Sequence, residues 1–412
     1  MEAEKQDVTV KNTTRKKGFL KYLGPALITS ALVVGPGSLT LASKIGAIYG
    51  YQLIWILIVT VIFMMIYTEI SMRIGLASNL TFIQLINQKW GKFGGILIGV
   101  GAFLVTTSFQ AGNSIGVGVA FSVITGLNTQ LLIVLLTILG IILLFSKNFY
   151  NLLENLMIGL IALMLLSFII TTVLVKPSVA SIASGFIPTI PEGSLGLIIA
   201  LTATSFSIVG AAYQSYLVKE KGWSIKDVNE GAKESYFGIF LLGLITLLVM
   251  IVGAAVLKPA GIMVDSVNEM GLTLEPLFGS WATIVFMFGL FGAAFSSLIG
   301  NATIGGAMLS DGVGFGNSLK DIRVKLMIIA VMLFGSIIAL IFGGAPVNMI
   351  VFAQAITIVV VPFIAIALLV VANDKEIMGE LKNTTTKNVI AIIGLIVLIL
   401  LAFNNVKNIF FS

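Results

Sequence analysis

Long stretches without any charged residue are the feature that most constrains how this chain can fold. One runs from Phe93 to Ser146 and another from Leu326 to Asn373. Each is long enough for two helices of about 20 residues, the length that crosses a hydrocarbon core of about 30 Å. Only 10% of the residues are charged, whereas a soluble domain carries about 25%. The sequence therefore predicts one integral membrane domain built from helices.

Apolar segments predict eleven membrane-spanning helices in an all-α fold. They cover residues 18–34 continuing to 49, 51–72, 93–123, 129–146, 150–175, 193–218, 235–257, 280–308, 324–343, 347–372 and 388–406. Five spans followed by five more must have opposite orientations, because five is odd. We therefore expect a first five-helix repeat over 18–175, a second, inverted repeat over 193–372, and an eleventh helix over 388–406. Residues 1–17 are polar and Lys-rich without the apolar core of a signal peptide, and we expect them to form a cytoplasmic tail.

Basic residues predict the orientation of these spans. With the N-terminus inside, twenty of the 24 Lys and Arg residues fall on the cytoplasmic side, and only Lys44, Lys176, Lys258 and Lys407 fall outside. This bias is typical of membrane proteins, so we expect a cytoplasmic N-terminus and an external C-terminus in the cell membrane. It also explains the net charge of +6 without a nucleic-acid partner. The expected partners are the lipid bilayer and a small-molecule or ion substrate, and we expect a monomer.

Two residue types that carry much protein chemistry are missing. The chain has no Cys and no His, which excludes disulfides, thiolate metal sites and imidazole proton carriers. The predicted spans also hold no pair of carboxylates. We therefore expect neither an enzyme nor a bound cofactor. Glu69 and Arg73, near the end of the second span, have the spacing of an i,i+4 ion pair.

Two interruptions at matching positions of the repeats indicate discontinuous helices. The first span is interrupted at Gly35-Pro36-Gly37-Ser38, where proline and two glycines oppose helix formation. The sixth span is interrupted by the small and polar residues 207–215. In inverted-repeat transporters such breaks form substrate and ion sites near mid-membrane. We expect half-helix N-termini after Ser38 and after Tyr213.

Several motifs resemble one family across nearly the whole chain. They are Gly24-Pro25-Ala26, residues 49–55 (YGYQLIW), residues 292–305 (GAAFSSLIGNATIG) and residues 374–381 (DKEIMGEL). They are similar to segments of the NRAMP (natural resistance-associated macrophage protein) divalent-metal transporters. The resemblance implies a leucine-transporter-type fold, with a 5+5 inverted repeat and discontinuous helices 1 and 6.

The chain departs from this family at the residues that define its chemistry. The family motif Asp-Pro-Gly-Asn has Gly35 and Ser38 here in place of the acid and the amide, and Met-Pro-His is replaced by residues 211–213, Ala-Ala-Tyr. The acidic pair that the resemblance places in a proton route is Gln110 and Asn113. Gln354 matches a family glutamine near the substrate.

These positions supply the candidate site residues. We expect substrate contacts from Gly35, Gly37, Ser38, Ala211, Tyr213, Gln214 and Gln354, and a pathway past Lys44, Gln110, Asn113, Asn301 and Asp311. Half-helix N-termini attract anions, so the leading hypothesis is a secondary transporter of a small organic acid or amino-acid-like solute. The alternative is a magnesium- or manganese-type transporter with a rebuilt, uncharged site. A channel or a transport-dead sensor is the third hypothesis. The coupling ion is expected to be sodium or a proton, with sodium favoured because so few ionisable residues lie in the spans.

Overall fold

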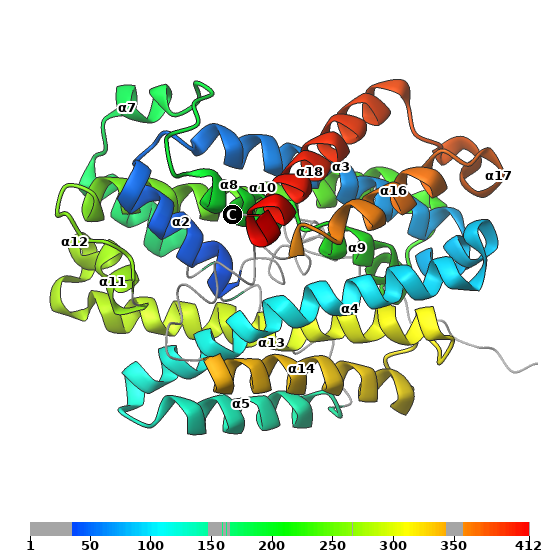
Figure 1. Cartoon of the computed structure of the whole chain (residues 1–412), viewed down its shortest axis with the longest axis horizontal. Coiled ribbons are helices and arrows are strands. Elements are labelled where there is room, and N and C mark those ends of the chain that lie inside the picture. The colour runs from blue at the N-terminus through cyan, green and yellow to red at the C-terminus, as the bar shows by residue number, and fades with distance from the viewer. Residues whose placement is uncertain are drawn as a thin grey trace, which may run out of the picture.

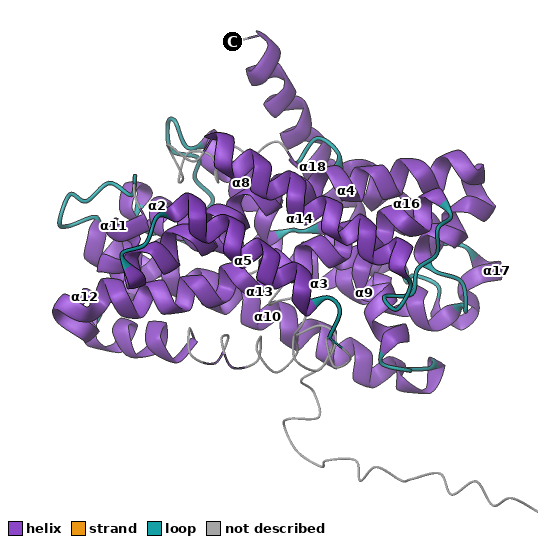
Figure 2. Ribbon diagram, turned by 90° about the horizontal axis from the view of Figure 1, so that it is seen from below, coloured by secondary structure: helices purple, strands orange, loops and turns teal. Residues whose placement is uncertain are grey.

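The computed structural model describes residues 35–146, 159, 162, 165–265, 267–342 and 357–411, and these residues contain helices and no strand. Figures 1 and 2 show the helices packed side by side. The principal ones are α2 (Pro36–Tyr49), α3 (Ile54–Ala77), α4 (Phe82–Thr125), α5 (Thr129–Leu143), α8 (Leu195–Ser205), α9 (Ile208–Glu220), α10 (Val228–Val252), α13 (Ala282–Val313), α14 (Ile322–Phe342), α16 (Val361–Ala372) and α18 (Thr385–Phe411). Short helices are α7 (Val179–Ser184), α11 (Val267–Gly271), α12 (Glu275–Phe278) and α17 (Lys375–Met378).

Many of the helices are suited to a membrane by length and composition. Seven helical stretches of the described chain are long and apolar enough to cross one, and Thr129–Leu143, Leu165–Val175 and Val361–Ala372 are shorter apolar helices. The predicted multi-pass helical architecture is confirmed. The count of eleven stays a prediction, because residues 1–34 and parts of the fifth and tenth predicted spans lie outside the described residues.

One half of the molecule is built around the pairing of α4 with α13. The two helices run side by side, with α14 and α5 packed next to them (Figure 1). Glycine allows this close approach. A Cβ atom added at Gly312 would lie 2.7 Å from the backbone oxygen of Gly95, and one added at Gly99 would lie 2.8 Å from that of Met308. Small residues at a helix contact let the two backbones touch, which is how membrane helices gain packing energy.

The other half is organised around α3, which packs against α8, α9, α10 and α16. α2 packs on α10 and on the π-helical turn Gly253–Leu257 that extends α10. Again a glycine sets the distance, since a Cβ atom at Gly46 would lie only 2.4 Å from the backbone oxygen of Met250. α2 and α9, which begin at the two predicted breaks, are therefore held by helices on several sides.

α4 begins before the predicted third span. Its first turns, from Phe82, are separated from the rest by a non-helical residue, Gly91, with φ 73° and ψ 174°. Thr81 and Gln84 form a capping box at its start, which stabilises a helix beginning there. The apolar pattern placed the span at 93, just after this kink, because it detects only the membrane-embedded part.

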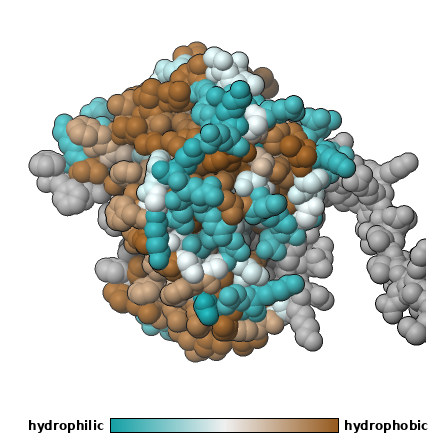
Figure 3. All heavy atoms as spheres, turned by 90° about the vertical axis from the view of Figure 1, so that its right-hand side faces the viewer, coloured by the Kyte–Doolittle hydropathy of each residue, from teal (hydrophilic) through white to brown (hydrophobic). Residues whose placement is uncertain are grey.

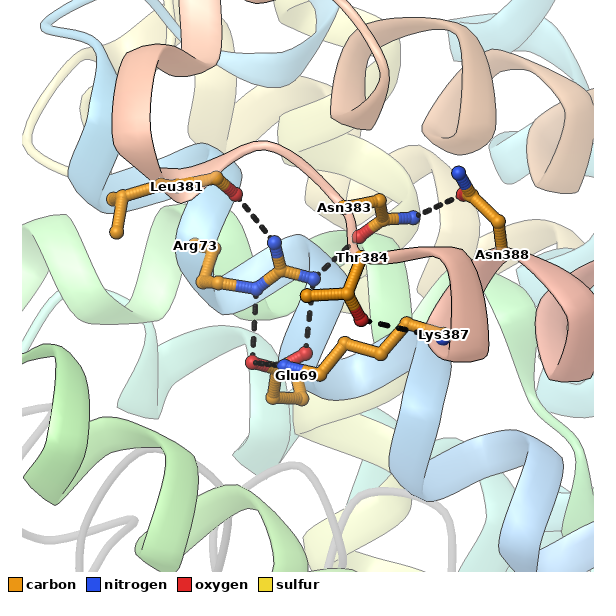
Figure 4. Close-up of polar contacts among 7 residues, drawn as sticks. All are labelled: Glu69, Arg73, Leu381, Asn383, Thr384, Lys387 and Asn388. Carbon is orange, nitrogen blue, oxygen red and sulfur yellow. Dashed lines mark hydrogen bonds and ion pairs between the residues drawn. The ribbon is translucent and has the colours of Figure 1, made fainter.

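The ends of α3 and α18 are joined by a buried charged cluster (Figure 4). Arg73 donates from Nε to Oε1 of Glu69 at 2.8 Å, which confirms the predicted i,i+4 pair. Lys387, at the start of α18, donates to the same oxygen at 2.7 Å. Arg73 also donates to Asn383 and to the backbone oxygen of Leu381. The neighbouring end face of the molecule is hydrophilic between two hydrophobic flanks, as expected where membrane helices meet water (Figure 3).

Candidate substrate site

The start of α2 forms one side of the candidate site. The helix begins at Pro36, with Gly35 as its N-cap in an extended conformation (φ −107°, ψ −174°) and no side-chain capping bond. Proline suits the first helical position because its missing N–H is not needed there. Gly37 and Ser38 therefore lie inside the first turn, and the expected helix start after Ser38, at Leu39, is three residues late.

The start of α9 forms a second side, and the predicted position of this break was wrong. α8 ends at Ser205 and α9 begins at Ile208, with only Phe206 and Ser207 between them. The side chain of Ser207 accepts a hydrogen bond from the backbone N–H of Gly210 at 3.4 Å. Residues 208–215 continue as helix because alanine favours helix most and serine is a strong N-cap. The small residues that predict an interruption therefore belong to the helix.

A cavity lies where these two helix starts meet α4, α8 and α13. It is lined by Gly35, Gly37, Ser38, Thr106, Phe109, Asn113, Thr204, Ser207, Val209, Gly210, Asn301 and Ile304. The space open to the centre of a water molecule is about 30 Å³. Ser38 and Thr204 join two of the walls through a hydrogen bond of 2.9 Å between their hydroxyl oxygens.

The structure brings together only some of the expected site residues. Five of them line the cavity, namely Gly35, Gly37, Ser38, Asn113 and Asn301. Ala211, Tyr213 and Gln214 lie buried within α9 and do not line it. Gln354 lies outside the described residues. Among the residues that sequence reasoning missed, Thr106 and Phe109 precede Asn113 by seven and four positions on one helix face, a spacing that could have found them.

Among the residues that the structure describes, no charged side chain lines this cavity. Within the described ranges no three His, Cys, Asp or Glu residues come together as a metal-binding group. The polar atoms available are hydroxyl and amide groups, together with the first turns of α2 and α9, neither of which carries an acidic residue. The arrangement therefore offers neutral oxygen donors beside two partly positive helix ends.

The space at Gly35 is narrow. A Cβ atom added there would lie 3.1 Å from Oγ of Ser297 and 3.2 Å from Oδ1 of Asn113. Both contacts are tighter than usual, so these neighbours would have to move to admit a larger residue. The side chains of Ser297 and Asn113 thus fill the region toward which an aspartate at position 35 would project.

Three amide side chains join α4 to α13 beside the cavity. Gln110 is fully buried, and its Nε2 donates to the backbone oxygen of Leu298 at 2.6 Å. Its Oε1 accepts from Nδ2 of Asn113 at 3.2 Å and from Nδ2 of Asn301 at 3.3 Å. Asn301 Nδ2 also donates to the backbone oxygen of Thr106 at 2.6 Å. Gln110 therefore lies behind the cavity wall rather than in it.

The two charged residues expected on the pathway lie away from the cavity lining. Lys44 forms an ion pair with Asp265 at 3.2 Å. Asp311, near the end of α13, is 4% exposed and accepts hydrogen bonds from Thr81 and, at 2.6 Å, from the hydroxyl of Tyr216. In this structure both residues tie helices and loops together.

Comparison with known proteins identifies the family. The family model "Natural resistance-associated macrophage protein-like" (Nramp) matches residues 26–407. The chain belongs to the Nramp family. Its members are membrane transporters and not enzymes, in agreement with the sequence analysis.

Curated Nramp relatives match the chain over almost its whole length. The "Divalent metal cation transporter MntH" of Caldanaerobacter subterraneus subsp. tengcongensis is 25% identical over 405 residues, covering 92% of this chain and 90% of that protein. The protein of the same name from Deinococcus radiodurans is 25% identical over 412 residues, covering 96% and 92%.

Solved structures share the fold. The Eremococcus coleocola manganese transporter, in complex with an aromatic bis-isothiourea substituted compound, superimposes with a TM-score of 0.79 at 19% identity, covering 98% of this chain and 93% of that one. MhsT in complex with L-phenylalanine gives a TM-score of 0.63 at 15% identity, covering 94% and 99%. These likenesses confirm the predicted leucine-transporter-type fold.

Proposed function

We propose that this Nramp-family protein is a secondary transporter that carries a hard divalent cation, of the magnesium or manganese type, through the neutral cavity. The observation that carries the proposal is the lining itself, a small space with oxygen donors from Ser38, Thr106, Asn113, Thr204 and Asn301. The named activity of the MntH relatives supports the same class of cargo.

The donor set favours hard ions over soft ones. Magnesium and manganese accept oxygen ligands, whereas thioether and imidazole ligands favour softer transition metals. Neutral oxygens cannot replace a whole hydration shell, so the ion would keep part of its water, as magnesium usually does in proteins. The space of about 30 Å³ compares with roughly 10–15 Å³ for one water molecule. It therefore suits an ion with very few waters.

The divalent cation is now the leading hypothesis, ahead of the organic acid that the sequence favoured. The comparisons give no support to a small organic acid, and the relatives favour the divalent ion that was the alternative. The organic acid remains the second candidate because of one observation. The first turns of α2 and α9 both line the cavity and contain no acidic residue, which suits a carboxylate.

The proposed transport is driven by a coupling ion, in a protein of defined orientation in the membrane. No titratable side chain lines the cavity in the described part of the chain, so sodium is a more natural coupling ion than a proton. The distribution of Lys and Arg supports a cytoplasmic N-terminus and an external C-terminus.

Uptake into proteoliposomes tests the function. Purified protein should take up manganese or magnesium in a saturable manner, and Ser38→Leu, which fills the cavity, should abolish this uptake. Ser114→Ala serves as the control, since Ser114 lies on α4 but bonds to Ser336 away from the cavity. Saturable uptake of a small carboxylate without divalent uptake would overturn the proposal in favour of the second candidate. Separate sodium and pH gradients identify the coupling ion.

A further inference from the structure

The three amides beside the cavity have orientations that their backbone partners determine. A backbone oxygen can only accept a hydrogen bond, so Gln110 must direct its NH₂ group at Leu298 and Asn301 must direct its NH₂ group at Thr106. The oxygen of Gln110 then accepts from the NH₂ groups of both Asn113 and Asn301. Exchanging the oxygen and nitrogen of any of these amides would place like atoms against each other.

This arrangement leaves two amide oxygens for another purpose. Oδ1 of Asn113 and Oδ1 of Asn301 accept no hydrogen bond from the described protein. The two residues are only 5% and 7% exposed. Neither oxygen is fully enclosed by protein, and both residues line the cavity. Asn113 Oδ1 lies on the Gly35 side of this lining, 3.2 Å from the position of a Cβ atom added at Gly35.

Leaving two buried acceptors unpaired is unfavourable unless something binds them. We infer that Oδ1 of Asn113 and Oδ1 of Asn301 are ligands of a hard, partly hydrated divalent cation in this cavity. The inference rests on the proposed function and deepens it by naming the binding atoms. It places the ion on the wall made by α4 and α13 rather than on side chains of the helix starts.

Chemistry at the helix starts supports this placement. The first turns of α2 and α9 present unpaired N–H groups and a partial positive charge, which repel a cation. The wall formed by α4 and α13 presents oxygens instead. Both Asn side chains donate to the same Gln110 oxygen, so their NH₂ groups lie close together on this wall, within reach of one partly hydrated ion.

Adding charge at these positions provides a test that misfolding cannot imitate. Asn113→Asp and Asn301→Asp each preserve the side-chain size and replace a neutral amide with a carboxylate, at the cost of the hydrogen bonds that the NH₂ group donates to Gln110 and, for Asn301, to the backbone oxygen of Thr106. Each should tighten manganese binding by about tenfold or more, since ligand charge strongly tunes affinity for hard cations. Asn113→Leu and Asn301→Leu should weaken it. Binding is measured on the purified full-length protein from the EPR signal of free Mn²⁺.

Asn128→Asp is the matched control. Asn128 is exposed and caps the start of α5, where aspartate caps equally well, so it adds the same charge away from the cavity and should leave the affinity unchanged. Unchanged affinity in both cavity aspartate variants, or equal tightening in Asn128→Asp, would overturn the inference.

The two proposals fail in different ways. Manganese uptake by the wild-type protein, combined with binding that neither cavity aspartate alters, removes the inference and keeps the function. Absence of divalent uptake by the wild type, combined with wild-type manganese binding that the cavity aspartates tighten and the leucine variants weaken, removes the transport function and keeps the positions of the ligand atoms.

Discussion

Neutralising Glu69 should destabilise the protein far more than neutralising Asp265, the exposed partner of Lys44 in another ion pair. The side chains of Glu69 and Arg73 are 2% and 5% exposed, and Lys387 is 28% exposed. Glu69→Gln removes the carboxylate that pairs with both cationic side chains, Arg73 and Lys387. Lys387 can then turn toward water, but the guanidinium of Arg73 stays buried.

The magnitude follows from this burial. Removing one partner of a buried ion pair lowers stability by about 3–5 kcal/mol. Arg73 keeps its hydrogen bonds to Asn383 and to the backbone oxygen of Leu381, so we expect a loss near the lower limit, about 3 kcal/mol. Asp265, the partner of Lys44, is 67% exposed. Asp265→Asn should therefore lose only about 0–1 kcal/mol.

Unfolding in mixed micelles by titration with SDS, followed by tryptophan fluorescence, measures both changes. Replacing the pair together, as Glu69→Leu with Arg73→Met, should lose less than Glu69→Gln alone, because no buried charge is left unpaired. A loss in Glu69→Gln no larger than that in Asp265→Asn would refute the reasoning. It would show that water already reaches the cluster.

Three further predictions concern other parts of the molecule. Gly46→Ala should destabilise the protein by about 1–3 kcal/mol in the same titration, because the new Cβ atom meets the backbone of Met250 and overpacks the contact with α10. An unchanged unfolding midpoint would contradict this close approach of the helices. Gly35→Ala should weaken manganese binding in the EPR assay without altering the unfolding midpoint, since its methyl group would crowd Asn113 Oδ1; unchanged affinity would contradict it. The hydrogen bond from Lys89 holds the pKa of Asp374 below its usual range. The charged carboxylate therefore stabilises the fold fully above the pKa of aspartate in the unfolded chain, about 3.9. This stabilisation is lost as the pH falls through the lower pKa of the folded state. Wild type should therefore exceed Asp374→Asn in melting temperature at neutral pH and lose that advantage in acid, and a difference independent of pH would disprove the assignment.

Local sequence patterns were sufficient for the features that depend on neighbouring residues. Charge-free stretches predicted a multi-pass helical protein because the bilayer excludes charge over a length that helices must match. The i,i+4 spacing predicted the pair of Glu69 and Arg73, which the helical repeat alone brings together. Gly35-Pro36 located the start of α2 to within three residues, because proline and glycine act on the backbone directly.

Tertiary structure decided the features that depend on distant contacts. Ala211, Tyr213 and Gln214 were expected at the site, yet α9 starts at Ile208 and carries them into packed helix. The cavity depends on contacts between residues far apart in the chain, such as the hydrogen bond from Ser38 to Thr204.

The amides of α4 and α13 show the difference most clearly. The sequence by itself determined that neutral residues, Gln110 and Asn113, stand where the family resemblance places acids. It could not determine which atom of each amide faces the cavity. Only the backbone oxygens of Leu298 and Thr106, brought close by helix packing, settle that orientation, because an oxygen that can only accept forces the nitrogen toward itself.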